Sequence, residues 1–227
     1  MSDTDEESGI QTEKHVKIVI LGETNVGKTS IVKRYCYDEF SRYYNQTVGA
    51  DFYLKRLSLP GRHEINIRIS DIGGFEFKGC MLQNYLFNAD VVILMYDISN
   101  ANSFEYLSVW LNEVDKLLER RPIVAVVGNK CDVEHHRNVK QNDVRRFVTN
   151  QKLYHFLVSS KTGEGVNNCF LELVVKHLGI TLTKSDREQQ QTIVKAEIMP
   201  PSARVPLRRK SSAISNSGPT TSICSTQ

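Results

Sequence analysis

Residues 22–30 read GETNVGKTS and match the pattern G-x-x-x-x-G-K-[ST]. They follow the apolar, β-rich run VKIVIL at residues 16–21, and Lys28 and Thr29 enter a predicted helix. Glycines let the backbone wrap around a phosphate, several N–H groups and the helix N-terminus favour negative charge, and the lysine reaches the outer phosphates. The stretch therefore predicts a phosphate-binding loop, with a chance match in a turn as the alternative.

Further apolar runs indicate the fold class. VVILMY (91–96), IVAVVG (123–128) and the weaker HFLVS (155–159) read as strands buried on both faces. Helix-like segments separate them, including SFEYLSVWLNEVDKLLE, for which Ser103 is the N-cap candidate. Alternating strands and helices predict an α/β fold with a parallel sheet. FYLKRLSL and INIRIS, joined by a Pro-Gly turn within residues 52–70, predict a hairpin that adds one antiparallel edge pair.

Length and composition bound the organisation of the chain. At 227 residues it can bury a core, and a formal net charge of +3 is too mild for nucleic-acid binding by bulk electrostatics. We expect an acidic flexible N-terminus at 1–13, one folded domain at 14–184 and a flexible tail at 185–227. No apolar run approaches the ~18 residues of a spanning helix.

The five cysteines are scattered and form no C-x-x-C pair. This pattern favours neither a disulfide framework nor a zinc site. It predicts a reducing, intracellular compartment.

The tetrad NKCD at residues 129–132 follows the predicted strand IVAVVG, where ligands of α/β proteins bind. A carboxylate there can accept two hydrogen bonds from a ring that offers N–H and NH₂ side by side, as guanine does and adenine does not. Asp132 therefore predicts a guanine nucleotide, with a solvated turn as the alternative. The loop SSK (159–161) can add backbone N–H contacts to the base, although the sequence Ser-Ser-Lys is also ordinary in loops.

These motifs, in this order, resemble those of the Ras-like small GTPases over about residues 14–180. QTVGADF (46–52) and YDISNANSFE (96–105) point to the Rab branch. The resemblance implies a P-loop NTPase of the small-GTPase fold, with a mostly parallel six-stranded sheet flanked by helices. It also implies that the chain binds GTP or GDP with Mg²⁺.

The resemblance assigns roles to individual residues. It implies that Thr47 completes the Mg²⁺ shell and touches the γ-phosphate, and that Asp71 holds Mg²⁺ through water. Metal contacts are thus expected from Thr29, Thr47 and Asp71, and catalytic contacts from Lys28, Thr47 and Gly74. Phe40 would stack on guanine, or else be a core aromatic that closes the first helix. The full set expected around the nucleotide is Glu23, Thr24, Asn25, Val26, Gly27, Lys28, Thr29, Ser30, Phe40, Thr47, Gly74, Asn129, Lys130, Asp132, Ser159, Ser160 and Lys161.

The stretch DIGGFE (71–76) departs from the Ras-like pattern. After the second glycine that pattern has glutamine, which positions the attacking water, whereas this chain has Phe75. The hypothesis is a GTP/GDP switch of membrane trafficking that binds GTP but hydrolyses it slowly. The alternative is a GTP-bound scaffold that recruits partners without cycling. Asp132 disfavours an ATP-using enzyme.

DIGG, the following GCML, residues 178–198 and the terminal CSTQ together resemble the divergent Rab twenty-eight subfamily. CSTQ matches C-a-a-X with glutamine last, which predicts a farnesyl group on Cys224, although its two middle residues are polar rather than aliphatic. One prenyl chain anchors weakly, so the RRK run (208–210) either adds attraction to anionic lipid or is a solvated charge run.

The resemblance also implies partners and a location. Effector, exchange-factor and GTPase-activating proteins would bind residues 41–52 and 71–86, and the protein itself would be a monomer that binds no nucleic acid. It would lie on the cytoplasmic face of the plasma membrane or of endosomal or cilium-associated membranes, with a soluble cytosolic pool.

Overall fold

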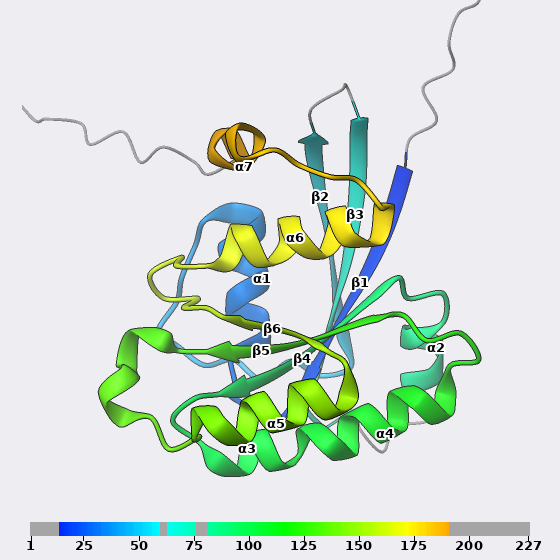
Figure 1. The fold of residues 1–227 in the computed structure, drawn as a ribbon. Helices are drawn as coiled ribbons and strands as arrows, with labels where there is room; N and C mark the ends of the chain where they lie inside the picture. The colour runs from blue at the N-terminus through cyan, green and yellow to red at the C-terminus, as the bar shows by residue number, and fades with distance from the viewer. Residues whose placement is uncertain (1–13, 60–62, 76–80, 191–227) are drawn as a thin grey trace, which may run out of the picture. The chain divides into compact units, whose positions relative to one another are not determined.

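The computed structural model describes residues 14–59, 63–75 and 81–190 (Figure 1). All of them belong to one compact unit, Met1–Thr192. Their strands form a six-stranded sheet in the order β2-β3-β1-β4-β5-β6. The strands are β1 (Lys14–Gly22), β2 (Ala50–Leu59), β3 (His63–Ile72), β4 (Val91–Asp97), β5 (Ile123–Asn129) and β6 (Tyr154–Leu157).

Only the β2–β3 pair of this sheet is antiparallel, and the pairs β1–β3, β1–β4, β4–β5 and β5–β6 are parallel. The predicted α/β class and mostly parallel sheet are therefore confirmed, and so is the antiparallel hairpin. The Pro-Gly turn predicted to join its strands lies outside the described residues.

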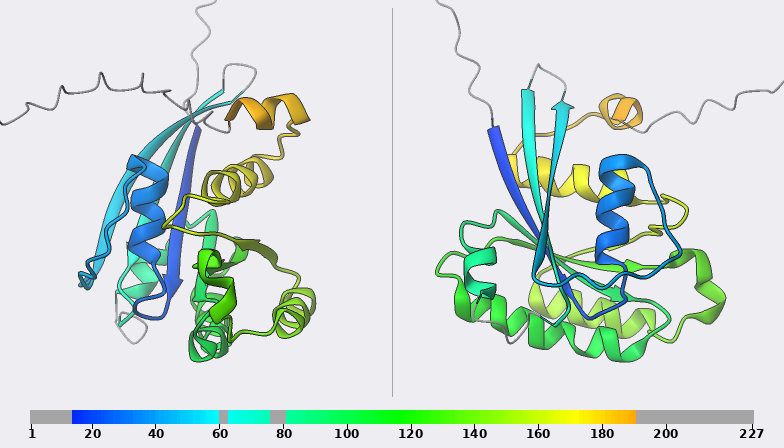
Figure 2. Two further views of the ribbon diagram at one scale, coloured as in Figure 1. Left: turned by 90° about the vertical axis from the view of Figure 1, so that its left-hand side faces the viewer. Right: turned by 180° about the vertical axis from the view of Figure 1, so that it is seen from behind.

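Helices cover both faces of the sheet. They are α1 (Lys28–Tyr37), α2 (Leu82–Leu86), α3 (Ala101–Glu105), α4 (Leu107–Leu117), α5 (Gln141–Gln151), α6 (Val166–Leu178) and α7 (Lys184–Gln190), with a 3₁₀ helix at Cys131–His136. Figure 1 shows α1 and α6 above the central strands and α3, α4 and α5 below them, and the rear view in Figure 2 shows the same two layers. None of the helices in the described ranges combines the length and apolar character needed to cross a bilayer.

Two apolar clusters hold these layers together. Side chains that alternate along β1 go to opposite faces, so Ile18 and Ile20 join one cluster with Phe170 of α6, while Val19 joins the other with Trp110 of α4. All seven residues of β4 are buried, as a central parallel strand covered on both faces requires. This rigid central sheet fixes the positions of the loops that leave its carboxyl edge.

The structure corrects two details of the sequence interpretation. Ser103 is not an N-cap but lies inside α3, whose cap is Asn100: the Asn100 side chain accepts from the Asn102 N–H at 3.1 Å. The Ser103 hydroxyl instead donates to the Asn100 carbonyl at 2.7 Å. The strand expected at 155–159 runs from Tyr154 to Leu157, because the chain then turns and the Val158 carbonyl accepts from the Cys131 N–H.

Beyond residue 184, where the sequence places the end of the domain, the chain continues as helix α7. Thr183 and Asp186 cap it reciprocally, since the Thr183 hydroxyl donates to Asp186 and accepts from the Asp186 N–H. Arg187 pairs with Glu172 of α6 at 2.7 Å. Residues 185–190 of the segment predicted as a flexible tail are therefore helical, while residues 1–13 and 191–227 lie outside the described residues.

Candidate functional site

A cavity of about 390 Å³ opens where the loops after β1, β3, β5 and β6 meet. This edge, at the carboxyl ends of parallel strands, is where α/β proteins bind ligands. Most of the residues expected around a nucleotide line the cavity: Thr24, Asn25, Gly27, Lys28, Thr29, Ser30, Phe40, Thr47, Gly74, Asn129, Lys130, Asp132, Ser160 and Lys161. The structure thus brings together side chains that lie up to 137 residues apart in the chain, from Thr24 to Lys161.

Three residues of the expected set do not line the cavity. Val26 is buried, and its carbonyl accepts from the Asn129 side chain. The Glu23 side chain accepts from the Trp110 indole N–H at 3.3 Å. Ser159 is buried, and its hydroxyl donates to the Asp132 carboxylate.

The Lys28 side chain is held inside the loop of residues 22–30, called here the phosphate loop. Its ammonium donates to the carbonyls of Gly22 and Glu23, both at 2.8 Å. Burial lowers the pKa of Lys28 to about 8, although the nearby Asp71 and Glu23 carboxylates partly oppose this shift. An anion in the cavity would stabilise the charged ammonium, so the residue is suited to bind phosphate.

Gly27 lets the phosphate loop approach the loop after β5. It has φ of 96°, and a Cβ atom there would lie 2.2 Å from the Asn129 side-chain nitrogen. The Asn129 side chain uses this space to donate to the Val26 carbonyl at 2.8 Å and to accept from the Ser160 N–H at 3.0 Å. Asn129 therefore joins the phosphate loop to the loops after β5 and β6.

Asp132 forms the other end of the cavity. One carboxylate oxygen accepts from the Ser159 hydroxyl at 2.7 Å, and the other pairs with the Lys161 ammonium at 3.2 Å. Partial burial raises the pKa of Asp132, but the hydrogen bonds from Ser159 and Lys161 outweigh it, so the net pKa lies below its ordinary value. Asp132 is thus an oriented, ionised acceptor.

The three residues expected at a metal meet at the Thr29 hydroxyl. This hydroxyl donates to an Asp71 carboxylate oxygen at 2.5 Å and lies 3.0 Å from the Thr47 hydroxyl. The other Asp71 oxygen, Oδ1, is buried without a hydrogen-bond partner among the described residues. Burial raises the pKa of Asp71 to about 6, against the hydrogen bond from Thr29 and the charge of Lys28.

This donor set fits Mg²⁺ and not a metal held by protein ligands alone. Hydroxyl and carboxylate oxygens are the ligands that Mg²⁺ prefers, and it usually takes one or two carboxylates together with substrate phosphates. No group of three or more His, Cys, Asp or Glu in the described ranges is arranged to hold a metal. The unpartnered Asp71 oxygen and the hydroxyls of Thr29 and Thr47 are the protein groups that would hold such an ion.

The segment after β3 lies against both the phosphate loop and residues 47–49. The Gly73 N–H donates to the Gly49 carbonyl at 2.8 Å. A Cβ atom on Gly74 would lie 2.6 Å from the Thr24 backbone nitrogen, so only glycine allows this approach. Phe75, the next residue in the chain, is 69% exposed. Phe40, which lies after α1, is half-buried and lines the cavity.

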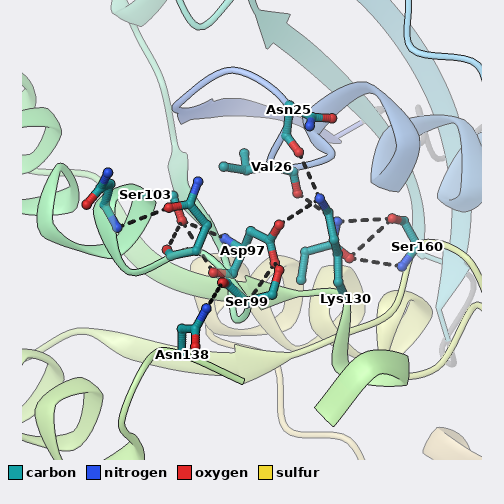
Figure 3. Close-up of polar contacts among 11 residues, drawn as sticks. Asn25, Val26, Asp97, Ser99, Ser103, Lys130, Asn138 and Ser160 are labelled. Carbon is teal, nitrogen blue, oxygen red and sulfur yellow. Dashed lines mark hydrogen bonds and ion pairs between the residues drawn. The ribbon is translucent and has the colours of Figure 1, made fainter. Parts of the chain in front are cut away.

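Sequence reasoning missed the supports of these loops. Arg34 of α1 donates to the carbonyls of Ser160 at 3.0 Å and Lys161 at 2.8 Å. Asp97, at the end of β4, pairs with Lys130 at 2.7 Å (Figure 3). No sequence motif reveals either contact, because each joins segments far apart in the chain. Cavity residues that were also missed are Lys33, Glu39 and Val133, and those expected only as part of a partner surface are Ser41, Arg42, Tyr43, Tyr44, Asn45, Gln46 and Gly73.

Comparison with known proteins agrees with this geometry. The sequence model of the Ras family matches residues 17–178. Ras-related protein Rab-28 of Caenorhabditis elegans is 34% identical over 190 residues, which cover 82% of this chain and 77% of the relative. Human Rab-30 is 33% identical over 160 residues (70% and 78%), and human Rab-21 is 34% identical over 157 residues (69% and 69%). The chain therefore belongs to the Ras family, as a small GTPase of the Rab branch.

Proposed function

We propose that this protein is a GTP/GDP switch of membrane trafficking that binds guanine nucleotide with Mg²⁺ and hydrolyses GTP slowly. The observation that carries the proposal is the oriented Asp132 carboxylate at one end of the cavity, with the Lys28 ammonium at the other. Asp132 would accept the two neighbouring donors of guanine, and Lys28 would bind the outer phosphates. Membership of the Rab branch gives the same general function.

The chain's own residues would contribute to hydrolysis mainly by positioning charge. Lys28 and the N–H groups of the phosphate loop would stabilise negative charge on the transferred phosphoryl group, and the Gly74 N–H would contact the γ-phosphate. Thr29, Thr47 and Asp71 would hold Mg²⁺, which when bound neutralises charge on the β- and γ-phosphates.

Phe75 is the reason to expect slow hydrolysis. Its side chain has no atom that can donate to or accept from water, and it points largely to solvent. GTP binding depends on other residues, so it would be retained. The protein would then stay in its GTP state until a partner protein supplies a group that orients the water.

Single-turnover hydrolysis of GTP preloaded on the full chain with Mg²⁺ tests this proposal. We expect Phe75→Gln to hydrolyse at least about tenfold faster than the unmodified protein, equivalent to ~1.4 kcal/mol of activation free energy. Phe87→Gln is the matched control, because Phe87 is 66% exposed and lies outside the cavity. Phe75→Leu separates the added amide from the lost ring, and it should stay as slow as the unmodified protein.

Equal rates for the unmodified protein and Phe75→Gln would contradict the explanation based on Phe75. If both are rapid, another group orients the water. If neither releases phosphate while both retain GTP, the second candidate is favoured, a GTP-bound scaffold that recruits partners without cycling.

Membrane attachment through a farnesyl group on Cys224 is part of the proposal. It is supported by the C-a-a-X match of CSTQ, which lies outside the described residues. Arg208, Arg209 and Lys210 would add attraction to anionic lipid on the cytoplasmic face of the plasma membrane, or of endosomal or cilium-associated membranes, beside a cytosolic pool. Mass spectrometry of the protein from eukaryotic cells should find the farnesyl mass, absent in Cys224→Ser.

Partner binding is proposed for the surface around the γ-phosphate end. Residues 41–52 and 71–86 would contact effector, exchange-factor and GTPase-activating proteins, and the switch itself would act as a monomer. Thr47 and Gly74 belong to these two segments and would each contact the γ-phosphate, so its loss would alter the surface offered to partners. A partner that binds the GTP form and not the GDP form would support this assignment.

A further inference from the structure

Asp97 is a buried carboxylate at the carboxyl end of β4, outside every motif that defines the nucleotide site. Its Oδ1 atom accepts from the Ser99 N–H at 2.8 Å and from the Ser99 hydroxyl at 2.7 Å. The Ser103 hydroxyl lies 3.0 Å from the Asp97 N–H, which donates to it. The two Ser99 contacts thus orient the carboxylate, and the Ser103 contact holds the backbone of the same turn (Figure 3).

The second carboxylate oxygen leaves this turn and reaches the loop after β5. Asp97 Oδ2 lies 2.7 Å from the Lys130 ammonium, and the Asp97 and Lys130 side chains are 9% and 33% exposed. Because the carboxylate is largely buried while the ammonium is one-third exposed, the pair is screened less than a pair between two exposed side chains. Oδ2 is therefore the atom through which β4 acts on the nucleotide site.

Lys130 also contacts the phosphate loop. Its ammonium also donates to the Asn25 carbonyl at 3.1 Å. Lys130 and Asn25 both have left-handed backbones, with φ of 68° and 61°, a conformation that residues other than glycine adopt rarely. Two loops in unfavourable conformations are thus joined by one ammonium, and that ammonium is fixed by Asp97.

We propose that Asp97 is a positioning residue for nucleotide retention, which acts by holding the Lys130 ammonium between β4 and the phosphate loop. The inference rests on the proposed function, because it assumes that the cavity binds guanine nucleotide. Asp97 does not line the cavity, so its effect reaches the ligand through Lys130 and Asn25. Loss of its charge should loosen both loops and shorten the lifetime of the complex.

The dissociation rate of GDP from the full-length protein in Mg²⁺ tests the proposal, with Asp97→Asn as the variant. Asparagine keeps an acceptor for Ser99 and removes the charge that faces Lys130. We expect GDP to leave about tenfold faster, as the loss of one hydrogen bond between charged groups implies. Inosine diphosphate, which lacks the exocyclic amine, should also leave Asp97→Asn about tenfold faster than it leaves the unmodified protein. The factor should be the same for both nucleotides because the substitution does not alter the contact between Asp132 and the base.

Asp115→Asn is the matched control. Asp115 pairs with Arg121 at 3.2 Å, half-exposed on α4 and outside the cavity, so the same substitution there should leave GDP dissociation unchanged. An equal acceleration in Asp115→Asn would mean that the effect is general and would overturn the proposal.

A double-mutant cycle with Lys130→Met separates positioning from a merely structural role. If Asp97 acts through Lys130, Asp97→Asn should cause less than about a twofold further change in the Lys130→Met background. A tenfold change in both backgrounds would overturn the proposal, as would the absence of any effect in the unmodified background. Failure of the unmodified protein to bind GDP would instead overturn the proposed function.

Discussion

Asn129 and Asp132 line one end of the cavity, whereas Asp71 is buried beside Thr29 at the other end. The contacts of these polar groups differ. The Asn129 side chain bonds to Val26 and Ser160. Both oxygens of Asp132 have partners. Asp71 Oδ1 has no hydrogen-bond partner within the described part of the chain, although it is buried. We call these the base end and the phosphate end.

The contacts that hold the surrounding loops differ in the same direction. The base-end loops bond to each other, to α1 through Arg34 and to β4 through Asp97. Near the phosphate end, Tyr43 is 88% and Val48 84% exposed. We therefore expect the base end to keep its geometry without nucleotide, whereas the phosphate end leaves a buried carboxylate oxygen that a ligand would satisfy. A switch needs this asymmetry, because one end must hold the nucleotide while the other responds to its γ-phosphate.

The largest expected effect is on base recognition at Asp132. Asp132→Asn replaces a carboxylate that has two acceptor oxygens with an amide that has one. At least one of the two hydrogen bonds from guanine is therefore lost, and the amide NH₂ of asparagine then faces an N–H donor of the base. We expect GDP affinity to fall by about three orders of magnitude, roughly 4 kcal/mol, as measured by competition with a fluorescent nucleotide. Xanthosine diphosphate, which offers an acceptor at that position, should gain affinity.

A matched change at the phosphate end tests whether this effect is specific to the base end. Asp71→Asn should not change the ratio of guanine to xanthine nucleotide affinity, since Asp71 lies with Thr29 and Lys28. If the ratio shifts equally in both variants, the division of the site into two ends is wrong.

The next effect concerns stability without nucleotide. Asn129→Ala would leave the Val26 carbonyl and the Ser160 N–H without the partner that the side chain supplies in the buried centre of the base end. At about 1–3 kcal/mol for each unsatisfied buried group, we expect the free energy of unfolding to fall by roughly 4 kcal/mol in urea titrations. A loss below about 1 kcal/mol would show that the base end is not preformed.

The sequence predicted the fold, the loops and most of the residues that line the cavity, because the motifs at 22–30, 71–76, 129–132 and 159–161 directly follow predicted strands. It did not predict Arg34 or Asp97 as supports. Arg34 contacts Ser160 across 126 residues of sequence, and no local pattern specifies such a pairing. Nor did it predict that α7 continues past residue 184, because the polar segment 184–190 is fixed by a cap and an ion pair rather than by an apolar face.

The pH dependence of stability should differ in sign between the two ends. Burial raises the pKa of Asp71 from 3.8 to about 6, so between these values the folded protein binds more protons than the unfolded chain. In metal- and nucleotide-free protein the free energy of unfolding should therefore fall from about pH 4 to pH 6, by roughly 3 kcal/mol for a shift of about two units. Above pH 6 this deficit stays constant.

Urea titrations of the two carboxylate variants measure these contributions. Asp71→Asn should be more stable than the unmodified protein at pH 7 and should lack the decrease between pH 4 and 6. Asp132 has a lowered pKa, so its contribution is present above its unfolded pKa and is lost as the pH falls. Asp132→Asn should therefore lose stability at neutral pH. The same sign for both variants would contradict the comparison.

The smallest expected effect is the stability change of Thr47→Ala. Thr47 makes one hydrogen bond of 3.0 Å to Thr29 at the phosphate end, and Thr29 keeps its bond to Asp71 when that contact is lost. The free energy of unfolding without nucleotide should change by less than about 1 kcal/mol. Because Thr47 is proposed to contact both Mg²⁺ and the γ-phosphate, the same variant should lose affinity for GTP and for a GTP-specific partner while it retains GDP. Equal losses for GTP and GDP would mean that Thr47 holds the nucleotide as a whole, and the phosphate end would then be as preformed as the base end.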